Sequence, residues 1–571
     1  MGLADIPVEV VSAENEAHGD YTTNVALRLS KQLGKSPMAV AAEIKEKYHT
    51  LYKENQKVST NNEQKLALQA IERIEVAAPG FINVFLSEAA LGTYISEVIK
   101  GGERYGTGTS LFREAKNILV EFAHPNTHKA FHIGHLRNIT TGEAVVRLLE
   151  ACGHTVTRAN YQGDVGMHIA KCLYALLHIP EIASQVEDVG SQDPHAKAEF
   201  LGRAYTAGST AFEEDEEAKK KIGEINKKIY AKDAEVYDLY QKTREWSLEY
   251  FAQIYKRVGT HYDRYYFEGE VYEEGKALVL NGLKSGIFER SEGAVIFPGK
   301  KYGLHNRVFV TGEGNATYEA KEMGLGKLQF AEYNPDLVIH VVGPEQAGYF
   351  QVVFEALARM FPETKGKEYH LVYGWVKLKH GKMSSRSGNV VLGEWLLDEA
   401  KKEVQKIIDQ NKTKYTKEQQ NEITEAAAVA AVKYSFLKVS TTQEIAFDLA
   451  ESVTFEGDSG PYLLYTHARA KSILRKAGEL SLESDSSVLN VEERAVARLL
   501  MYFPEIVAEA AHALSPSLLC SYLFELAQAF NLFYHKHQIL ESKSRVRLTA
   551  AVAQVLLNGL TLLGIPVVNQ M

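Results

Sequence analysis

The chain has 571 residues, of which 45% are hydrophobic and 24% are charged, so it has the composition of a soluble globular protein with three or four domains. It has no apolar run near the ~20 residues of a membrane helix and no secretory signal, and its three scattered cysteines suit neither a disulfide framework nor a zinc site; we therefore expect a cytoplasmic protein with free thiols. The net charge of −9 neither supports nor excludes a nucleic-acid partner, because an acidic enzyme can carry a local basic face.

Residues 1–110 are predicted to form a small α+β domain. Two amphipathic helices and two strands are expected, in the segments 24–33, 38–48, 71–77 and 81–86. The two strands flank Pro79-Gly80, which is a turn signal. The polar stretch 52–65 between the helices and the strands is predicted to be a loop.

Residues 111–395 alternate between apolar strands and helices, which predicts a doubly wound parallel sheet of the Rossmann type. The predicted strands are 118–122, 156–161, 337–342 and 368–373. Ligands of such sheets bind outside the carboxyl ends of the strands, where Glu121 and Asn160 fall. A helical insertion is expected at about 175–260, and its charged part is interpreted as a solvated helix face.

Residues 396–571 are rich in alanine, leucine and glutamate, and Gly and Pro occur mainly at breaks such as 457–461. This pattern predicts an all-helical domain built as a bundle.

The motif His132-Ile133-Gly134-His135 follows the first strand of the predicted sheet and precedes a segment with helical spacing. A helix start offers free backbone N–H groups and the positive end of the helix dipole to phosphates. The imidazoles can add hydrogen bonds, and Gly134 lets a flat base approach the backbone. On its own the motif is weak, because histidines near a helix start are more often cap or core residues.

A second motif, Gly381-Lys382-Met383-Ser384-Ser385-Arg386-Ser387-Gly388, is a small basic loop that suits the charge developing on a transferring phosphoryl group. Alone it would be interpreted as a solvated turn. The two motifs in this order resemble the signatures His-Ile-Gly-His and Lys-Met-Ser-Lys-Ser of class I aminoacyl-tRNA synthetases.

Further motifs resemble those of the arginyl-tRNA synthetases. They are Glu121-Phe122-x-x-Pro125-Asn126-x-x-Lys129, Leu136-Arg137-Asn138, the segments 160–166 and 316–324, the segment 18–26 near the start, and the segments 465–469 and 559–565 near the end. The resemblance runs along nearly the whole chain. It implies an N-terminal domain that contacts tRNA, a catalytic domain and an anticodon-binding domain, with ATP, L-arginine and tRNA(Arg) as substrates and a monomer as the expected state.

For ATP, the resemblance implies contacts from His132, Gly134 and His135 and from the loop residues Lys382, Met383, Ser384 and Ser385. His132 and His135 would contact the triphosphate, and Lys382 would neutralise the transition state. The loop departs from the family pattern, because Ser385 replaces its second lysine, and we infer that Lys129 supplies the missing charge. Mg²⁺ is expected to enter with ATP, with no tightly bound cofactor and no protein ligand set for a metal.

For arginine, the resemblance implies that Glu121 and Glu322 face the guanidinium, since carboxylates pair with its planar fork of donors. Tyr318 would also contact the side chain, and Asn126 and Gln346 would hold the backbone end of the substrate.

Two positions depart from the family pattern: residue 322 is usually Asp, and His124 replaces a small residue. A structural salt bridge is the alternative for the two glutamates. Asp164 could orient the substrate or simply make a turn.

Several alternatives stay open from the sequence. A synthetase for glutamate would need arginines facing its substrate, and one for cysteine would need a thiolate zinc site; a lysine enzyme or a non-catalytic tRNA-binding paralogue are further possibilities. Five aromatic residues of the last unit could stack on anticodon bases or belong to the core: Tyr434, Tyr465, Tyr522, Phe530 and Tyr534. A basic stretch around Arg469 could meet phosphates.

Overall fold

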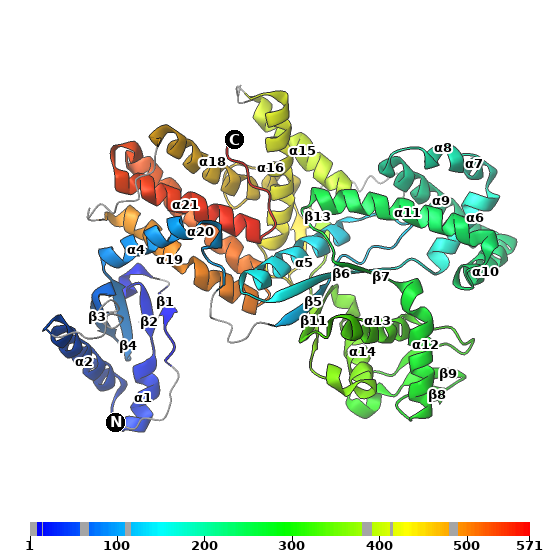
Figure 1. Ribbon diagram of the computed structural model, residues 1–571, viewed down its shortest axis with the longest axis horizontal. Coiled ribbons are helices and arrows are strands. Elements are labelled where there is room, and N and C mark those ends of the chain that lie inside the picture. The colour runs from blue at the N-terminus through cyan, green and yellow to red at the C-terminus, as the bar shows by residue number, and fades with distance from the viewer. Residues whose placement is uncertain are drawn as a thin grey trace.

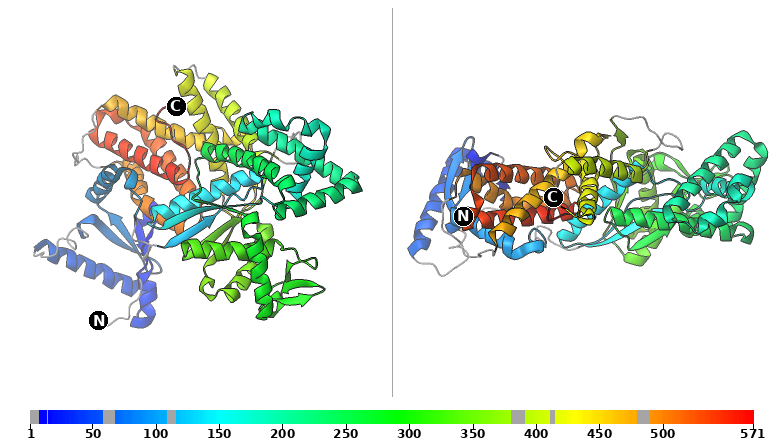
Figure 2. Two further views of the ribbon diagram at one scale, coloured as in Figure 1. Left: turned by 45° about the vertical axis from the view of Figure 1, so that its right-hand side comes forward. Right: turned by 90° about the horizontal axis from the view of Figure 1, so that it is seen from above.

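The computed structural model describes residues 8–13, 15–57, 68–108, 116–379, 391–410, 415–478 and 489–571. Figure 1 shows a central sheet with a small sheet-containing unit beyond the C-terminal helices on one side and a group of helices on the other. Figure 2 shows that the molecule is long and comparatively flat, with the N-terminal unit and the helices of residues 167–257 at opposite ends. None of the helices described is both long enough and apolar enough to cross a membrane.

The N-terminal unit is an antiparallel four-stranded sheet in the order β1-β2-β4-β3, with two helices packed against it. Its elements are β1 (Val11–Ser12), β2 (Tyr21–Thr23), α1 (Val25–Leu33), α2 (Pro37–Lys57), β3 (Ile71–Ala77), β4 (Phe81–Leu86) and α4 (Glu88–Gly101). The two predicted helices and both predicted strands are confirmed. The loop predicted from residue 52 is wrong up to Lys57, because Lys, Glu and Gln are good helix formers and carry α2 onward. Residues 58–65 lie outside the described residues.

The central sheet is parallel, with the strand order β12-β11-β5-β6-β7. The strands are β5 (Asn117–Glu121), β6 (Thr155–Gln162), β7 (Arg264–Phe267), β11 (Leu337–Val342) and β12 (Glu368–Val372). The chain runs outward from β5 to β7 and then returns to fill the other side, so the order reverses between β5 and β11. Such a switch point opens a crevice for ligands at the carboxyl ends of the strands. The doubly wound parallel sheet predicted from the sequence is confirmed.

Helices cover both faces of this sheet (Figure 1). One face packs on α5 (Ile133–Ala151), whose apolar side chains share a core with the C-terminal helices. The other face packs on α12 (Glu268–Lys284) and α13 (Tyr318–Tyr333), and α14 (Ala347–Met360) follows beside them. A small antiparallel sheet between α12 and α13 was not predicted; its strands are β8 (Glu289–Ser291), β9 (Ala294–Phe297) and β10 (Arg307–Val310).

A run of helices with its own apolar core separates β6 from β7. The helices are α6 (Met167–His178), α7 (Pro180–Ala183), α8 (Val186–Gly190), α9 (Pro194–Glu214), α10 (Glu216–Tyr230) and α11 (Ala234–Arg257). The charged faces of α10 point outward while Ile222, Ile225 and Ile229 are buried, so this helix is amphipathic as its sequence suggests.

The last part of the chain is helical in the residues described, apart from β14 (Ile445–Phe447), which pairs in parallel with β13 (Val376–Leu378). The helices are α15 (Gly393–Gln410), α16 (Lys417–Leu437), α17 (Leu449–Ser452), α18 (Gly460–Ala477), α19 (Val491–His512), α20 (Pro516–Lys536) and α21 (Lys543–Leu562). Pro461 and Pro516 stand in the first turns of α18 and α20, where a missing N–H costs nothing. The division into units 1–110, 111–395 and 396–571 stays a prediction.

Candidate active site

A cavity of about 1160 Å³ opens at the carboxyl ends of β5, β6 and β11, beside the switch point of the sheet. Eight residues assigned to ATP or arginine from the sequence line it, as does His124: Glu121, Asn126, His132, Gly134, His135, Tyr318, Glu322 and Gln346. They come from segments up to 225 positions apart in the chain (121 to 346), and the fold brings them to one hollow. Lys382, Met383, Ser384 and Ser385 lie outside the described residues.

The two histidines of the first motif cap the start of α5 in a reciprocal arrangement. The backbone N–H of Gly134 donates to His132 Nδ1 at 3.1 Å, and the backbone N–H of His132 donates to His135 Nδ1 at 3.2 Å. The rings stack with their centroids 3.6 Å apart. Since each Nδ1 accepts a hydrogen bond, each neutral ring carries its proton on Nε2.

Both imidazoles are neutral at physiological pH. Burial, with a smaller contribution from the nearby charge of Lys129, lowers the pKa of His132 to about 4. Burial also holds the pKa of His135 well below 6.5, with a contribution from His132. The site therefore presents two Nε2–H donors beside a helix start, which suits the oxygens of a polyphosphate.

Gly134 has a second role that the sequence did not indicate. A Cβ atom at this position would lie 2.9 Å from Cε1 of His132, closer than side-chain atoms pack. Glycine is therefore needed to keep the His132 ring in its capping position.

Glu121 ends β5 and also lines the cavity, with 1% of its surface exposed. Gln329 Nε2 donates to its Oε2 at 2.5 Å, while His340 Nδ1 and His124 Nδ1 lie 3.5 and 3.6 Å from its Oε1. Burial alone would raise the pKa of Glu121, but the positive charge of His340 outweighs it and lowers that pKa below its ordinary value. Glu121 is therefore a buried carboxylate.

Glu322, on α13, differs from Glu121 in its protonation. Burial and the negative charge of Glu121 raise the pKa of Glu322 to about 8. Of these two glutamates, Glu121 is therefore ionised and Glu322 is mostly protonated at neutral pH. A bound cation with several N–H donors would satisfy both groups and draw the proton off Glu322.

Glu268, at the start of α12, is another of the glutamates that line the cavity. Its Oε2 accepts from Lys321 Nζ at 2.5 Å. A Cβ on Gly163 would lie 2.1 Å from Asn126 Oδ1 and 3.4 Å from Glu268 Oε1, so both oxygens gather over the bare Cα of this glycine. Two such oxygens can accept from an ammonium group. Sequence reasoning missed Glu268, because an acidic residue in the first turn of a helix is ordinary.

Tyr318 and Gln346 stand at the rim of the cavity. Tyr318 begins α13 with 63% of its surface exposed, and Gln346 belongs to the 3-10 turn Pro344–Gln346 after β11. Lys129 is near the site without lining it: its Nζ lies 5.5 Å from the ring centroid of Tyr205 on α9.

Asp164 fastens the loop after β6 to neighbouring helices. Its carboxylate accepts from Tyr240 Oη at 2.9 Å and from the backbone N–H of Gly269 at 2.9 Å, and it pairs with Arg244. These contacts favour the structural interpretation of Asp164 over a substrate contact.

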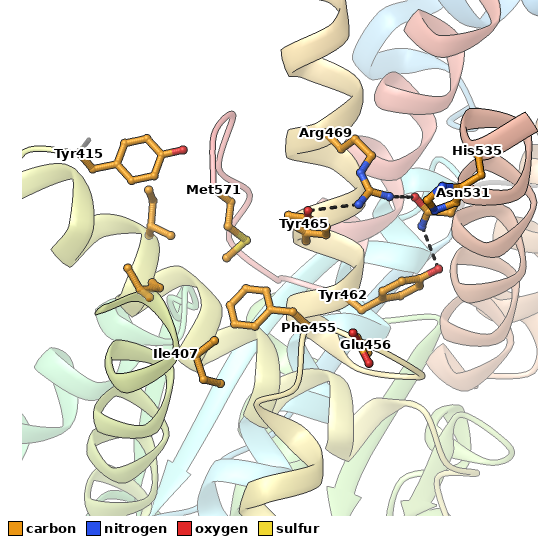
Figure 3. Close-up of a pocket in the computed structure, with 12 residues that line it drawn as sticks. Ile407, Tyr415, Phe455, Glu456, Tyr462, Tyr465, Arg469, Asn531, His535 and Met571 are labelled. Atoms are coloured by element: carbon orange, nitrogen blue, oxygen red, sulfur yellow. Dashed lines mark hydrogen bonds between the residues drawn. The ribbon is translucent and has the colours of Figure 1, made fainter. Parts of the chain in front are cut away.

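A second cavity, of about 680 Å³, lies among α15, α16, α18 and α20 (Figure 3). Arg469 donates to Tyr465 Oη at 3.2 Å and to Asn531 Oδ1, and its guanidinium lies 4.7 and 5.0 Å from the ring centroids of Tyr465 and Tyr534. Asn531 Nδ2 in turn donates to Tyr462 Oη at 2.9 Å, and the C-terminal residue Met571 closes one side. Of the aromatics suggested for stacking, Tyr434, Tyr522 and Phe530 are buried in the core and cannot reach a base.

Comparison with known proteins identifies the family. Three family models match in order along the chain: "Arginyl tRNA synthetase N terminal domain" over residues 1–86, "tRNA synthetases class I (R), catalytic domain" over residues 95–449, and "DALR anticodon binding domain" over residues 463–571. The chain belongs to the arginyl-tRNA synthetases of class I. The resemblance drawn from the motifs is thereby confirmed.

This synthetase is similar to curated bacterial relatives along most of its length. An arginine–tRNA ligase of Treponema denticola is 34% identical over 86% of this chain and 85% of its own, and one of Fusobacterium nucleatum is 30% identical over 99% and 95%. Among solved structures, Thermus thermophilus arginyl-tRNA synthetase matches with a TM-score of 0.79 and 26% identity over 99% of this chain and 97% of its own. The enzyme of Plasmodium falciparum, at 21% identity and a TM-score of 0.75 over 99% of this chain and 95% of its own, supports the fold alone.

Proposed function

We propose that this synthetase activates L-arginine with ATP, forming arginyl-adenylate and pyrophosphate, and then transfers arginine to the 3′ end of tRNA(Arg) with release of AMP. The observation that carries the proposal is a single cavity with two neutral imidazole donors at a helix start on one wall and a pair of acidic groups on the other. The first wall suits a triphosphate and the second suits a guanidinium.

Arginine lies in this proposal with its guanidinium between Glu121 and Glu322 and its side chain against Tyr318. Asn126 and Gln346 hold the backbone end. Glu268 joins them at the α-ammonium group, since its oxygen and that of Asn126 gather at Gly163. The α-carboxylate then faces the motif histidines across the cavity and attacks the α-phosphorus of ATP.

For ATP, His132 and His135 donate from Nε2 to phosphate oxygens and stabilise the charge that develops there. The adenine end is assigned to the edge near Trp375, Val376 and Val391, which line the same cavity beyond Gly134. Mg²⁺ neutralises phosphate charge when it is bound with ATP. The residues described form no group of three or more His, Cys, Asp and Glu side chains that could hold this ion by themselves, so its ligands in this proposal are mainly phosphate oxygens.

Lys382, Met383, Ser384 and Ser385 are assigned to ATP binding, and Lys129 to the positive charge that Ser385 does not supply in place of the second lysine of the motif. The effect of Lys129 on the pKa of His132 supports this role, because it places the ammonium charge within electrostatic reach of the phosphate site. The side chain would have to leave Tyr205 to reach a phosphate.

tRNA(Arg) is the proposed macromolecular partner, and the cavity of Figure 3 is the proposed seat of an unpaired anticodon base. Tyr465, Tyr462 and Arg469 offer flat surfaces for stacking, and Asn531 offers an amide for hydrogen bonding. We further propose a cytoplasmic monomer, in keeping with three buried free cysteines.

The test is aminoacylation of a tRNA pool with each of the twenty amino acids, together with pyrophosphate exchange. Only arginine should be charged. Charging of glutamate, cysteine or lysine would select another synthetase, and tRNA binding without any charging would select the non-catalytic paralogue.

A further inference from the structure

Beside the guanidinium site, three neighbouring strands bring charged side chains together. His340 on β11 lies opposite Glu121 on β5 in the strand register, and Glu368 on β12, which is opposite Val338, approaches His340 diagonally. His340 Nε2 is 2.7 Å from Glu368 Oε2, and His340 Nδ1 is 3.5 Å from Glu121 Oε1. The side chains are 1%, 4% and 5% exposed for Glu121, His340 and Glu368, so water screens none of these charges.

His340 is a cation. Burial by itself would lower the pKa of His340, but Glu121 and Glu368 together raise it well above its ordinary value. Phe350 and Phe354 of α14 pack on the ring, with centroids 5.0 and 5.3 Å away, and hold it between the two carboxylates.

The two contacts of His340 are unequal. Glu368 accepts a short hydrogen bond from His340 Nε2, whereas Nδ1 makes only a longer ion-pair contact of 3.5 Å with Oε1 of Glu121. The imidazolium therefore compensates the charge of Glu121 without using up the oxygens of that carboxylate, which stay available to a ligand in the cavity.

We propose that His340, held by Glu368, is a positioning residue for substrate selection. Its positive charge keeps Glu121 ionised although Glu322 lines the same cavity. The site therefore prefers a guanidinium to a neutral group of the same shape. This inference rests on the proposed function. Without His340, the main influence that offsets burial is lost, and burial raises the pKa of Glu121 as it raises that of Glu322, so both carboxyl groups are protonated before the ligand binds. A pair of protonated carboxyl groups would accept the neutral urea group of citrulline nearly as well as arginine.

Titratable groups on every neighbouring element surround these three side chains. They are His124 after β5, Tyr161 on β6, Glu268 on α12, Glu322 on α13, Tyr349 on α14 and His370 on β12. Burial raises the pKa of both tyrosines and lowers that of His124 and His370, so these four are neutral. Glu121 and Glu322 are therefore the carboxyl groups of the cavity whose protonation responds to His340.

The test is calorimetry of arginine and citrulline binding to the full-length protein and to His340→Gln, at pH 7 in two buffers of different ionisation enthalpy. The variant should bind arginine about tenfold more weakly or worse, and arginine binding should release about two protons instead of about one, because Glu121 as well as Glu322 must now ionise. The preference for arginine over citrulline should fall. In pyrophosphate exchange, the KM for arginine should rise while the KM for ATP stays unchanged.

His370→Gln is the matched control. His370 lies beside His340 in the sheet and contacts Phe350, but its Nε2 donates to the carbonyl of Val342 and it does not line the cavity. This variant should leave the proton count and the preference unchanged. Glu368→Gln, which keeps the imidazole in place, should show a smaller effect in the direction of His340→Gln and serves if the latter does not fold.

An unchanged proton count and an unchanged preference in His340→Gln, or in Glu368→Gln if that variant is needed, would overturn the role of His340 alone. A wild-type protein that binds citrulline as tightly as arginine would overturn the proposed function and this inference together.

Discussion

The two acidic side chains of the guanidinium wall differ in protonation because their neighbours differ. Glu121 has a cation, His340, and an amide donor beside it, whereas Glu322 faces another negative charge in a buried position. Glu322, which is one methylene longer than the Asp usual in the family, is thus mostly protonated before the guanidinium binds. Substrate binding is then coupled to proton loss from the cavity.

We therefore predict that arginine affinity rises with pH. The pKa of Glu322 in the empty cavity is raised to about 8, and the guanidinium binds its ionised form, so affinity should increase up to about tenfold per pH unit below pH 8 and level off above it. Equilibrium dialysis between pH 6 and 9 measures this. In Glu322→Gln the pH dependence should disappear along with most of the affinity; a slope that persists in that variant would contradict the assignment.

The motif histidines should affect chemistry rather than arginine binding. His135→Ala removes a charge-stabilising donor and should slow adenylate formation about 100-fold. Gly134→Ala keeps both histidines but places its Cβ against the His132 ring, so it should slow the same step with unchanged arginine affinity. Pyrophosphate exchange at saturating arginine checks both variants. A fully active Gly134→Ala enzyme would show that the position of the His132 ring does not matter.

Helix α5 links the motif at its start to a buried ionic cluster further along. Glu143 is fully buried and accepts from Arg147, Arg158 and Thr260, while Arg147 also donates to the carbonyls of Thr561 and Gly259. Burial would raise the pKa of Glu143, but hydrogen bonds and charge from the two arginines lower it overall. The Glu143 carboxylate thus holds α5 to β6 and to Thr260 after the insertion, while Arg147 holds α5 to the last helix.

Replacing Glu143 should destabilise the protein strongly, since it leaves two cations around an uncharged group. Glu143→Gln should cost about 3 kcal/mol or more of unfolding free energy. Because the pKa of Glu143 is lowered in the folded state, its contribution is present above the ordinary carboxyl pKa and is lost as pH falls through the folded value. Thermal unfolding at pH 7 measures the loss. Glu216→Gln, which breaks an exposed pair with Lys219, should leave Tm nearly unchanged.

The elements that the sequence predicts well are those with a strong apolar pattern. The apolar core of β11 and the run ending at Glu121 mark strands on their own, and His-Ile-Gly-His is found in its expected place at a strand–helix junction. Strand β7 (Arg264–Phe267) escaped prediction, because four residues with a charged first position carry no recognisable alternation.

His340 escaped for a related reason. A single histidine in the apolar strand β11 looks like a core residue, and only the pairing of β11 with β5 and β12 brings it within reach of Glu121 and Glu368. Glu121 and Glu322 are far apart in the sequence, and periodicity likewise cannot predict that the fold brings them into one cavity. The family motifs predict that both glutamates face the substrate, but their protonation states depend on neighbours that only the folded structure shows.

At the scale of the whole molecule, the catalytic sheet and the C-terminal helices share one continuous core, so the two proposed ends of the tRNA-binding surface are rigidly connected. The N-terminal unit joins the same core through α4, which packs on α19 and α21, and Asp20 adds a polar link because its carboxylate pairs with Arg494 and Arg498 of α19. At the centre of the junction, Lys433 of α16 is fully buried and donates to the carbonyls of Val258 and Gly564 at 2.8 and 2.5 Å. It thereby joins the insertion and the C-terminal segment.

Lys433 should give the molecule a distinctive dependence on pH. Burial, together with the nearby charge of Arg147, lowers the pKa of Lys433 to about 7. The unfolded chain therefore binds more protons than the folded one between pH 7 and the ordinary lysine pKa, so the Lys433 contribution to stability should increase as pH rises from 7 to 9. Lys433→Met removes this charge and leaves two carbonyls without their donor, so it should lower Tm at pH 9 by more than at pH 7. Calorimetry of both proteins at the two pH values measures the difference, and an equal loss at both would show that Lys433 remains charged in the folded junction throughout.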